Sequence, residues 1–161
     1  MTPHPSFEEK ICPPGELPAR VSALPRPLVF TNGVFDVLHR GHASYLAESR
    51  ALGSSLVVAL NSDASVRQLG KGPDRPINTL EDRLALVAAL ESVSLATWFE
   101  ADTPLELILG CRPDVLVKGG DWTVDKIVGG KEVAGWGGKV VSIPLRFKRS
   151  TTSLLSRIRK P

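Results

Sequence analysis

The chain has 161 residues, of which 42% are hydrophobic and 23% are charged, and its formal net charge is +3. This length favours one domain with a single core, and the composition excludes collagen-like and low-complexity proteins. No apolar run approaches the roughly 20 residues of a membrane span, and no secretory leader is expected at the start. Two cysteines, Cys12 and Cys111, do not make a disulfide framework, so a reducing, cytoplasmic location fits best.

The first 27 residues differ in composition from the rest of the chain. They hold seven of the thirteen prolines, a density that argues against packed secondary structure. We therefore predict a proline-rich N-terminal arm or wrapping segment over residues 1–27, in which any helix near Ser6–Lys10 is short. A single domain is expected over residues 28–161.

From residue 28 onward, short apolar runs alternate with stretches of helical spacing. The runs are rich in valine and leucine, which is typical of strands that are buried on both faces. They cover residues 28–32, 55–61, 95–99, 114–119 and 139–144. Helices are predicted within residues 42–52, 79–93, 103–109 and 150–160. This alternation predicts an α/β fold, with a Rossmann-like, five-stranded parallel sheet that is flanked by helices and binds ligands at the carboxyl ends of its strands.

The stretch GVFDVLHRGH, which begins at Gly33, lies between the first predicted strand and the first predicted helix. Gly33 allows a tight turn, and Gly41 allows a close approach to the helix start, whose free N–H groups attract anions. His39 and His42 lie on one side of that turn and would donate hydrogen bonds to phosphate oxygens. The alternatives are a chance pair of histidines or half of a metal site, for which His4 is the only further imidazole.

A second candidate for phosphate binding is the loop LGKGPDRPIN, residues 69–78. Lys71 lies between two glycines and Arg75 follows closely, which predicts a mobile lid that brings positive charge to phosphates. An ordinary solvated loop is the alternative. Neither a Walker A loop nor a G-x-G-x-x-G motif is present in the sequence.

Two further stretches carry candidate ligand groups. Residues 147–155, FKRSTTSLL, place four hydroxyls at a helix start behind Arg149, which is more than a cap requires. The stretch CRPDVLVKGGDW ends a predicted strand with KGGD, from Lys118 to Asp121, where backbone groups would contact the edge of a base. The alternatives are an ordinary helix cap and a plain glycine turn.

The pattern G-x-F-D-x-x-H-x-G-H resembles the signature of the cytidylyltransferase-like nucleotidyltransferases. The resemblance implies that His39 and His42 contact the nucleotide phosphates and stabilise the transition state, while Lys71 acts from the lid. It also implies two sets of binding residues. The nucleotide would contact Asn32, Gly33, Phe35, Gly41, Lys118, Gly119, Asp121, Arg149, Ser150, Thr151 and Thr152. The acceptor would contact Asp36, Asn61, Asp63 and Arg83. The alternative for Arg83 is a helix-surface arginine that pairs with a neighbouring carboxylate.

Several stretches, NSDASVRQLGKGPDRPIN among them, resemble the subgroup that transfers an adenylyl group from ATP to a heptose 1-phosphate. This resemblance covers about residues 28–159 and implies Mg²⁺ bound mainly through the ATP phosphates, with no protein ligand assigned to the metal. A homodimer is expected by analogy, without a nucleic acid or membrane partner. The alternatives are a sister enzyme that uses CTP and glycerol 3-phosphate, another ATP-using adenylyltransferase, and a non-catalytic nucleotide sensor. The stretch RFKRSTT is more basic than in that family, and no role is assigned to Lys148.

Overall fold

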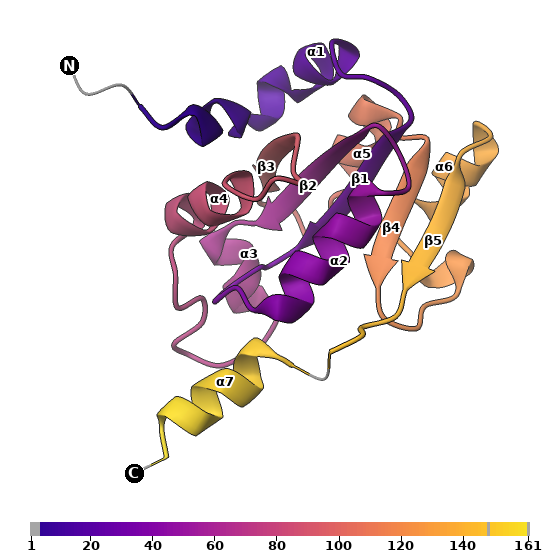
Figure 1. The fold of residues 1–161 in the computed structure, drawn as a ribbon. Coiled ribbons are helices and arrows are strands. Elements are labelled where there is room, and N and C mark those ends of the chain that lie inside the picture. Colours follow the sequence, from indigo (N-terminus) through magenta and orange to yellow (C-terminus); the bar gives the residue numbers. More distant parts are fainter. Residues whose placement is uncertain (1–3, 148, 161) are drawn as a thin grey trace.

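The computed structural model describes residues 4–147 and 149–160, so Lys148 lies outside the described residues. At its centre is a five-stranded parallel sheet in the order β3-β2-β1-β4-β5 (Figure 1). The strands are β1 (Leu28–Gly33), β2 (Ser55–Asn61), β3 (Leu95–Phe99), β4 (Val115–Gly119) and β5 (Lys139–Ile143). Each strand agrees with its predicted range to within one residue at either end, and the predicted α/β fold is confirmed.

Helices cover both faces of this sheet. The α-helices are α1 (Leu17–Ser22), α2 (Arg40–Arg50), α3 (Asp63–Gln68), α4 (Leu80–Ala88), α5 (Leu105–Cys111), α6 (Gly130–Gly135) and α7 (Thr151–Ile158). Short 3-10 helices are η1 (Ser6–Lys10), η2 (Pro14–Glu16) and η3 (Val124–Lys126). Helices α2 and α4 bury Leu46 and Val87 against one face. Helices α1, α5 and α6 bury Leu17, Ile108 and Val133 against the other face.

The edge strand β5 differs from the expectation that every strand is buried on both faces. Lys139 is exposed, the next three residues are half-buried, and Ile143 is the buried end of the strand. The apolar pattern of β5 resembles that of a central strand, but β5 has a neighbour, β4, on one side only. Strand position in the sheet therefore decides burial where the pattern of residues does not.

The proline-rich N-terminal segment is packed against the sheet, which agrees with a wrapping segment, but the expectation that it holds no packed element is wrong. Cys12 and Leu17 are fully buried, and the N–H of Cys12 donates to the carbonyl of Ala96 in β3 at 2.8 Å. Pro14 and Pro18 stand in the first turns of η2 and α1, where a missing N–H costs nothing. These prolines begin helices instead of preventing them. The short helix expected near Ser6–Lys10 is present as η1.

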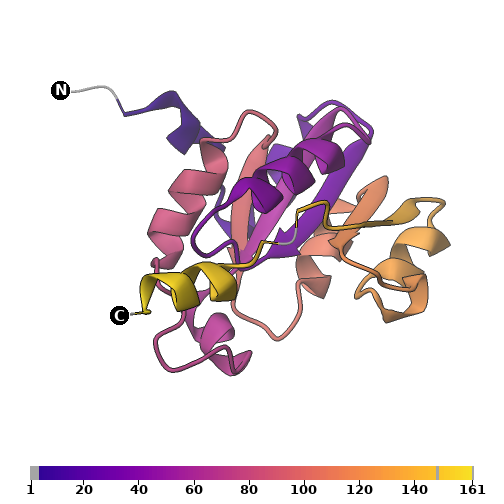
Figure 2. The ribbon, with the colours of Figure 1, turned by 60° about the horizontal axis from the view of Figure 1, so that its bottom comes forward.

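The carboxyl ends of the strands form the edge at which a ligand is expected. Chain connections leave β1 toward β2 and β3, then return to place β4 on its other side, so the strand order reverses between β1 and β4. Helix α7 lies beyond this edge and extends away from the sheet (Figure 1), and in Figure 2, where this edge comes forward, it crosses in front of the other elements. Among the described residues, no helix has the length and apolar character needed to cross a membrane.

Candidate active site

Two histidines form the start of α2, directly after the turn that follows β1. His39 is the N-cap residue, and its Nδ1 accepts a hydrogen bond from the N–H of Gly41 at 3.1 Å. In return, Nδ1 of His42 accepts a hydrogen bond from the N–H of His39 at 3.4 Å. This reciprocal arrangement satisfies two N–H groups at the helix start, a task that usually falls to Ser, Thr, Asp or Asn. Gly41 is required here because a Cβ would lie 2.9 Å from the His39 ring.

These hydrogen bonds fix the state of both imidazoles. Because each Nδ1 accepts, the proton of each neutral ring lies on Nε2, which stays available as a donor. Burial, followed by the charges of His39 and Lys71, lowers the pKa of His42 to about 4. Burial and the charge of Arg149 lower the pKa of His39 as well. The ring centroids are 3.8 Å apart, so two protonated rings would repel, and this repulsion favours neutral rings whose Nε2–H groups can donate.

The turn between β1 and α2 holds two residues in a strained backbone conformation. Phe35 and Val37 have φ values of 52° and 51°, in the left-handed region that non-glycine residues avoid. Each such residue costs on the order of 1–3 kcal/mol and persists only where its surroundings hold it in place. Asp36 lies between them, and its hydrogen bonds hold this turn against other segments of the chain.

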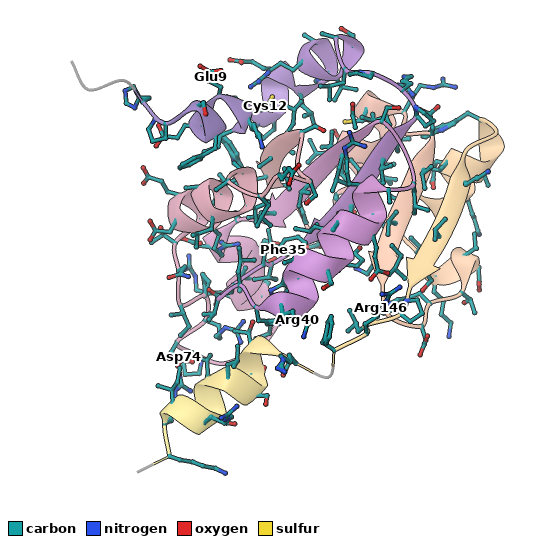
Figure 3. The ribbon with its side chains drawn as sticks, viewed as in Figure 1. Glu9, Cys12, Phe35, Arg40, Asp74 and Arg146 are labelled. Atoms are coloured by element: carbon teal, nitrogen blue, oxygen red, sulfur yellow. The ribbon has the colours of Figure 1, made fainter. Side chains whose placement is uncertain are left out.

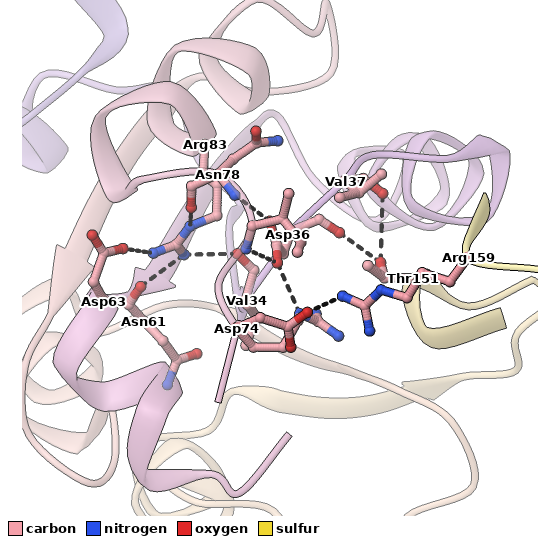
Figure 4. A network of polar contacts seen from close by, with 12 residues as sticks. Val34, Asp36, Val37, Asn61, Asp63, Asp74, Asn78, Arg83, Thr151 and Arg159 are labelled. Atoms are coloured by element: carbon pink, nitrogen blue, oxygen red, sulfur yellow. Dashed lines mark hydrogen bonds and ion pairs between the residues drawn. The ribbon is translucent and has the colours of Figure 1, made fainter. Parts of the chain in front are cut away.

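Asp36 connects the turn to two distant parts of the chain (Figure 4). Its carboxylate accepts hydrogen bonds from Nε of Arg75 at 2.9 Å and from the N–H groups of Ile77 and Asn78 at 2.8 and 3.0 Å. Its carbonyl accepts the hydroxyl hydrogen of Thr151 at 2.5 Å. Burial alone would raise the pKa of Asp36, but the hydrogen bonds from Asn78, Ile77 and Arg75 outweigh it and lower that pKa. The carboxylate is therefore ionised and already fully engaged, which differs from the expectation that it contacts the acceptor.

The start of α7 uses its hydroxyls for more than one purpose. Ser150 is the N-cap residue, and its Oγ accepts the N–H of Ser153 at 3.0 Å. Thr151 is buried and its hydroxyl is committed to Asp36, whereas Thr152 and Arg149 are exposed beside it. Of the four hydroxyls, Ser150 therefore caps the helix, Thr151 binds the signature turn, and Thr152 lines the cavity between the two helix starts, whereas Ser153 does not line it. Figure 3 places Asp74, from the predicted lid, beside α7, and this carboxylate forms an ion pair with Arg159.

A cavity of about 560 Å³ lies between the starts of α2 and α7. This volume is within the range of about 300–1,000 Å³ that is usual for small-ligand sites. The structure brings most of the predicted nucleotide and catalytic residues to this first cavity. Its lining includes Asn32, Gly33, Phe35, Asp36, His39, Gly41, His42, Lys71, Lys118, Gly119, Arg149, Ser150, Thr151 and Thr152. The roles of these residues remain predictions.

Four of the predicted residues do not line the first cavity. Asn61 lines a second, smaller cavity of about 330 Å³ at the same edge of the sheet, and Asp121 is exposed outside both cavities. Arg83 is fully buried and also lies outside both. Asp63 lies outside both as well, because its carboxylate is bound to Arg83 at 2.6 Å.

Arg83 does not face an acceptor phosphate, because its guanidinium is surrounded by protein acceptors (Figure 4). Nη1 donates to the carbonyls of Val34 and Asn61 at 2.9 and 2.8 Å, and Nε donates to the carbonyl of Asn78 at 3.1 Å. The guanidinium thus joins the end of β2 to the signature turn and to the residues before α4. This finding corrects the expected direct contact: Arg83 holds the turn in place.

Five residues that line the first cavity were not in the predicted site set: Val34, Tyr45, Arg75, Leu145 and Phe147, of which Arg75 belongs to the predicted lid. Tyr45 lies one turn of α2 after His42, and its hydroxyl is 2.5 Å from that of Thr31. Tyr45 could have been predicted, because it stands three residues after His42 and therefore lies on the same side of α2. Phe147 supports Arg40, whose guanidinium carbon lies 4.0 Å from the centre of the Phe147 ring, and nothing in the local sequence indicated that contact.

Comparisons with known proteins agree with this geometry. The family model described as cytidylyltransferase-like matches residues 30–153. The D-beta-D-heptose 1-phosphate adenylyltransferase of Bordetella bronchiseptica is 57% identical over 156 residues, which cover 96% of each chain. The bifunctional protein HldE of Hahella chejuensis is 52% identical over 133 residues, which are 83% of this chain and 28% of that protein. The chain thus spans little more than a quarter of the bifunctional relatives that it matches.

Solved structures give the same picture of the fold. The lipopolysaccharide core biosynthesis protein of Thermoplasma volcanium has a TM-score of 0.61 and 30% sequence identity, covering 76% of this chain and 98% of that chain. Pantoate-beta-alanine ligase of Francisella tularensis has a TM-score of 0.58 at 13% identity, covering 88% of this chain and 68% of that one. At that identity the likeness extends to the fold alone.

Proposed function

Because the chain belongs to the cytidylyltransferase-like family, we propose that it transfers the adenylyl group of ATP to a heptose 1-phosphate. The products are an ADP-heptose, for lipopolysaccharide core assembly, and pyrophosphate. The observation that carries this proposal is the 57% identity, across 96% of both chains, to a heptose 1-phosphate adenylyltransferase. The open hydrogen-bond donors of the first cavity supply the chemistry that such a transfer requires.

The starts of α2 and α7 border the first cavity, and the triphosphate would lie between them. Free N–H groups and the helix dipole make the starts of α2 and α7 favourable for anions. In the reaction, an oxygen of the acceptor phosphate forms a bond to the α-phosphorus of ATP, and the bond from that phosphorus to the β-phosphate oxygen breaks. Nε2–H of His39 and of His42 would donate to the phosphate oxygens on which charge develops. Lys71 and Arg149 would neutralise the departing pyrophosphate.

Magnesium is proposed to bind through the ATP phosphates. Among the described residues, no group of three His, Cys, Asp or Glu side chains is placed to hold a metal ion. Asp36 is the carboxylate that lines the first cavity, and its oxygens are occupied by Arg75 and two N–H groups. The donor set therefore fits a metal that is carried in by the nucleotide, and the ion would offset charge on the leaving phosphates.

A pyrophosphate-release panel tests the proposal directly. ATP, CTP, GTP and UTP are each paired with heptose 1-phosphate, glycerol 3-phosphate and phosphopantetheine, with and without Mg²⁺. We expect ATP with heptose 1-phosphate to be preferred by about 10²-fold or more, because a site that bonds one base edge leaves groups unpaired with another. A preference for CTP with glycerol 3-phosphate would indicate the sister enzyme. Tight ATP binding without turnover of any pair would indicate a nucleotide sensor.

Three further predictions accompany this function. A cytoplasmic location is supported by Cys12 and Cys111, which are buried as free thiols. A homodimer is proposed by analogy with other proteins of this fold, and light scattering on the purified chain would measure it. We also propose that residues 28–161 form a single domain. Residues 1–27 differ from it in composition and pack against it.

A further inference from the structure

A third cavity, of about 350 Å³, lies between the lid and α7. The lid contributes Lys71, Asp74 and Arg75 to its lining. Helix α7 and its C-cap contribute residues at helical spacing, which therefore share one side of the helix: Thr152, Leu155, Ser156 and Arg159. Lys71, Arg75 and Thr152 also line the first cavity, so the two cavities adjoin beside the start of α7.

Polar side-chain contacts hold α7 to the rest of the chain at its two ends. At its start, the buried hydroxyl of Thr151 donates to the carbonyl of Asp36. At its end, the guanidinium of Arg159 forms an ion pair with Asp74 of the lid (Figure 4). Two turns of helix separate these contacts, and the third cavity lies along them. The ion pair thus borders the end of the third cavity that is farther from the start of α2.

Positive charge dominates the third cavity. Lys71, Arg75 and Arg159 line it, and Asp74 is the acidic residue in its lining. Burial, followed by the charge of Arg75, lowers the pKa of Lys71, and an anion beside both residues would relieve this repulsion. Leu155 is the apolar side chain of the lining, so the cavity suits a compact anion better than a base or a sugar ring.

The ion pair can exchange partners at little cost. The side chains of Asp74 and Arg159 are each about half exposed, and pairs of this kind contribute little to stability. A phosphate group offers Arg159 the same kind of acceptor as a carboxylate, in a geometry that a guanidinium fits well. An anion that enters the third cavity would therefore compete with Asp74 for Arg159.

Resting on the proposed function, we propose that the third cavity is the exit site for pyrophosphate and that the Asp74–Arg159 pair is its outer gate. Once its bond to the α-phosphorus has broken, the diphosphate keeps its contact with Lys71 and moves along α7 out of the first cavity. There it takes Arg159 from Asp74. The lid around Lys71 is then no longer bound to α7 and can open, while Arg75 stays bound to Asp36.

The variants Arg159→Gln and Asp74→Asn test this assignment, because the exit site predicts opposite effects for them. Isothermal titration calorimetry on the full chain measures the Kd for inorganic pyrophosphate and for ATP in metal-free buffer. Arg159→Gln should raise the Kd for pyrophosphate about fivefold to tenfold, since a charge-assisted hydrogen bond is lost. Asp74→Asn should lower it about threefold, since the competing carboxylate is removed.

ATP and two further variants serve as controls. ATP is a polyanion too, so it reports any general effect of charge, and its Kd should stay within about twofold because its triphosphate lies in the first cavity. Arg157→Gln, on α7, and Glu91→Gln, after α4, make the same changes of charge at exposed positions that line none of the three cavities. Both controls should keep each Kd within about twofold.

The outcomes separate this inference from the proposed function. Equal weakening of pyrophosphate binding in Arg159→Gln and Asp74→Asn would reduce the pair to a structural contact, and the exit site would be overturned. Unchanged pyrophosphate binding, or a parallel shift in the Kd for ATP, would overturn it as well. If ATP and heptose 1-phosphate yield pyrophosphate in these cases, the function stands without the exit site. If the two variants shift the Kd in opposite directions but no substrate pair yields pyrophosphate, the third cavity stands as a diphosphate site and the function fails.

Discussion

The signature turn and the lid loop both line the first cavity, yet the chain holds them in different ways. In the turn, Phe35 and Asp36 are buried, and the start of α2 is closed by hydrogen bonds between its own histidines. In the lid, Lys71 and Asp74 are exposed, and Gly70 and Gly72 flank the lysine in left-handed conformations. One part of the site is thus held by buried hydrogen bonds, and we expect the exposed stretch around Lys71 to be the more mobile of the two.

The difference matches the task proposed for each part. Donors that stabilise charge in a transition state are most effective when they need no rearrangement during the reaction. A cation that must admit ATP and release pyrophosphate benefits from a loop that opens. The two parts join at the Asp36 carboxylate, which accepts hydrogen bonds from Arg75, Ile77 and Asn78 at the end of the lid. Variants in the fixed part should therefore change stability as well as rate, while variants in the lid should change rate alone.

The largest effect is expected from Arg83→Met. The thioether retains much of the volume but leaves the carbonyls of Val34, Asn61 and Asn78 without their donor. Breaking such a buried network costs about 3–5 kcal/mol of the free energy of unfolding. Urea unfolding measures this loss, and Arg67→Met, at an exposed site on α3, is the control. If Arg83→Met unfolds at the same urea concentration as the control and loses only affinity for the acceptor, Arg83 contacts the acceptor directly after all.

Arg83 also illustrates where the sequence is informative about this fold and where it is not. The five strands were predictable because buried parallel strands need apolar runs, and these runs stand out from their surroundings. The positions of the strand ends in turn located the histidines, the lid and the start of α7 at one edge. A single arginine in a helix carries no such pattern, since its partners are carbonyls from segments distant in sequence. The packing of the prolines near Cys12 was hidden for the same reason.

The second-largest effect, a loss of turnover, is expected from His42→Ala. Loss of the Nε2–H donor should lower turnover by about 10²-fold or more while ATP still binds. The hydrogen bond to the N–H of His39 is lost too, so stability should fall by about 1 kcal/mol. Single-turnover pyrophosphate release and thermal unfolding measure the two effects, with the exposed His4→Ala as control. Near-normal turnover in both His42→Ala and His39→Ala would make the pair a helix cap and nothing more.

Lys71→Ala should reduce turnover by about 10-fold to 10²-fold, because an unneutralised leaving group raises the barrier. The lysine is exposed in a glycine-flanked loop, so the melting temperature should stay within about 1 °C of the wild-type value. The control is Lys131→Ala, an exposed lysine at the start of α6. A marked fall in melting temperature for Lys71→Ala alone would show that the loop is packed, and the contrast between the two parts of the site would disappear.

The smallest effect concerns pH, and it tests the fixed state of the histidines. An imidazole has an ordinary pKa near 6.5, whereas the pKa of His42 is about 4 in the folded chain. His42 is therefore neutral across the range from about pH 6 to pH 8, and kcat/KM should show no loss as pH rises through 6.5. Between the two pKa values the unfolded chain binds the extra proton, so His42 makes the fold less stable as pH falls from 6.5 toward 4. Urea unfolding at several pH values should show this fall in wild-type protein and a shallower one in His42→Ala. If kcat/KM instead falls as pH rises through 6.5, a protonated imidazole takes part in the reaction. The start of α2 would then be less fixed than its hydrogen bonds indicate.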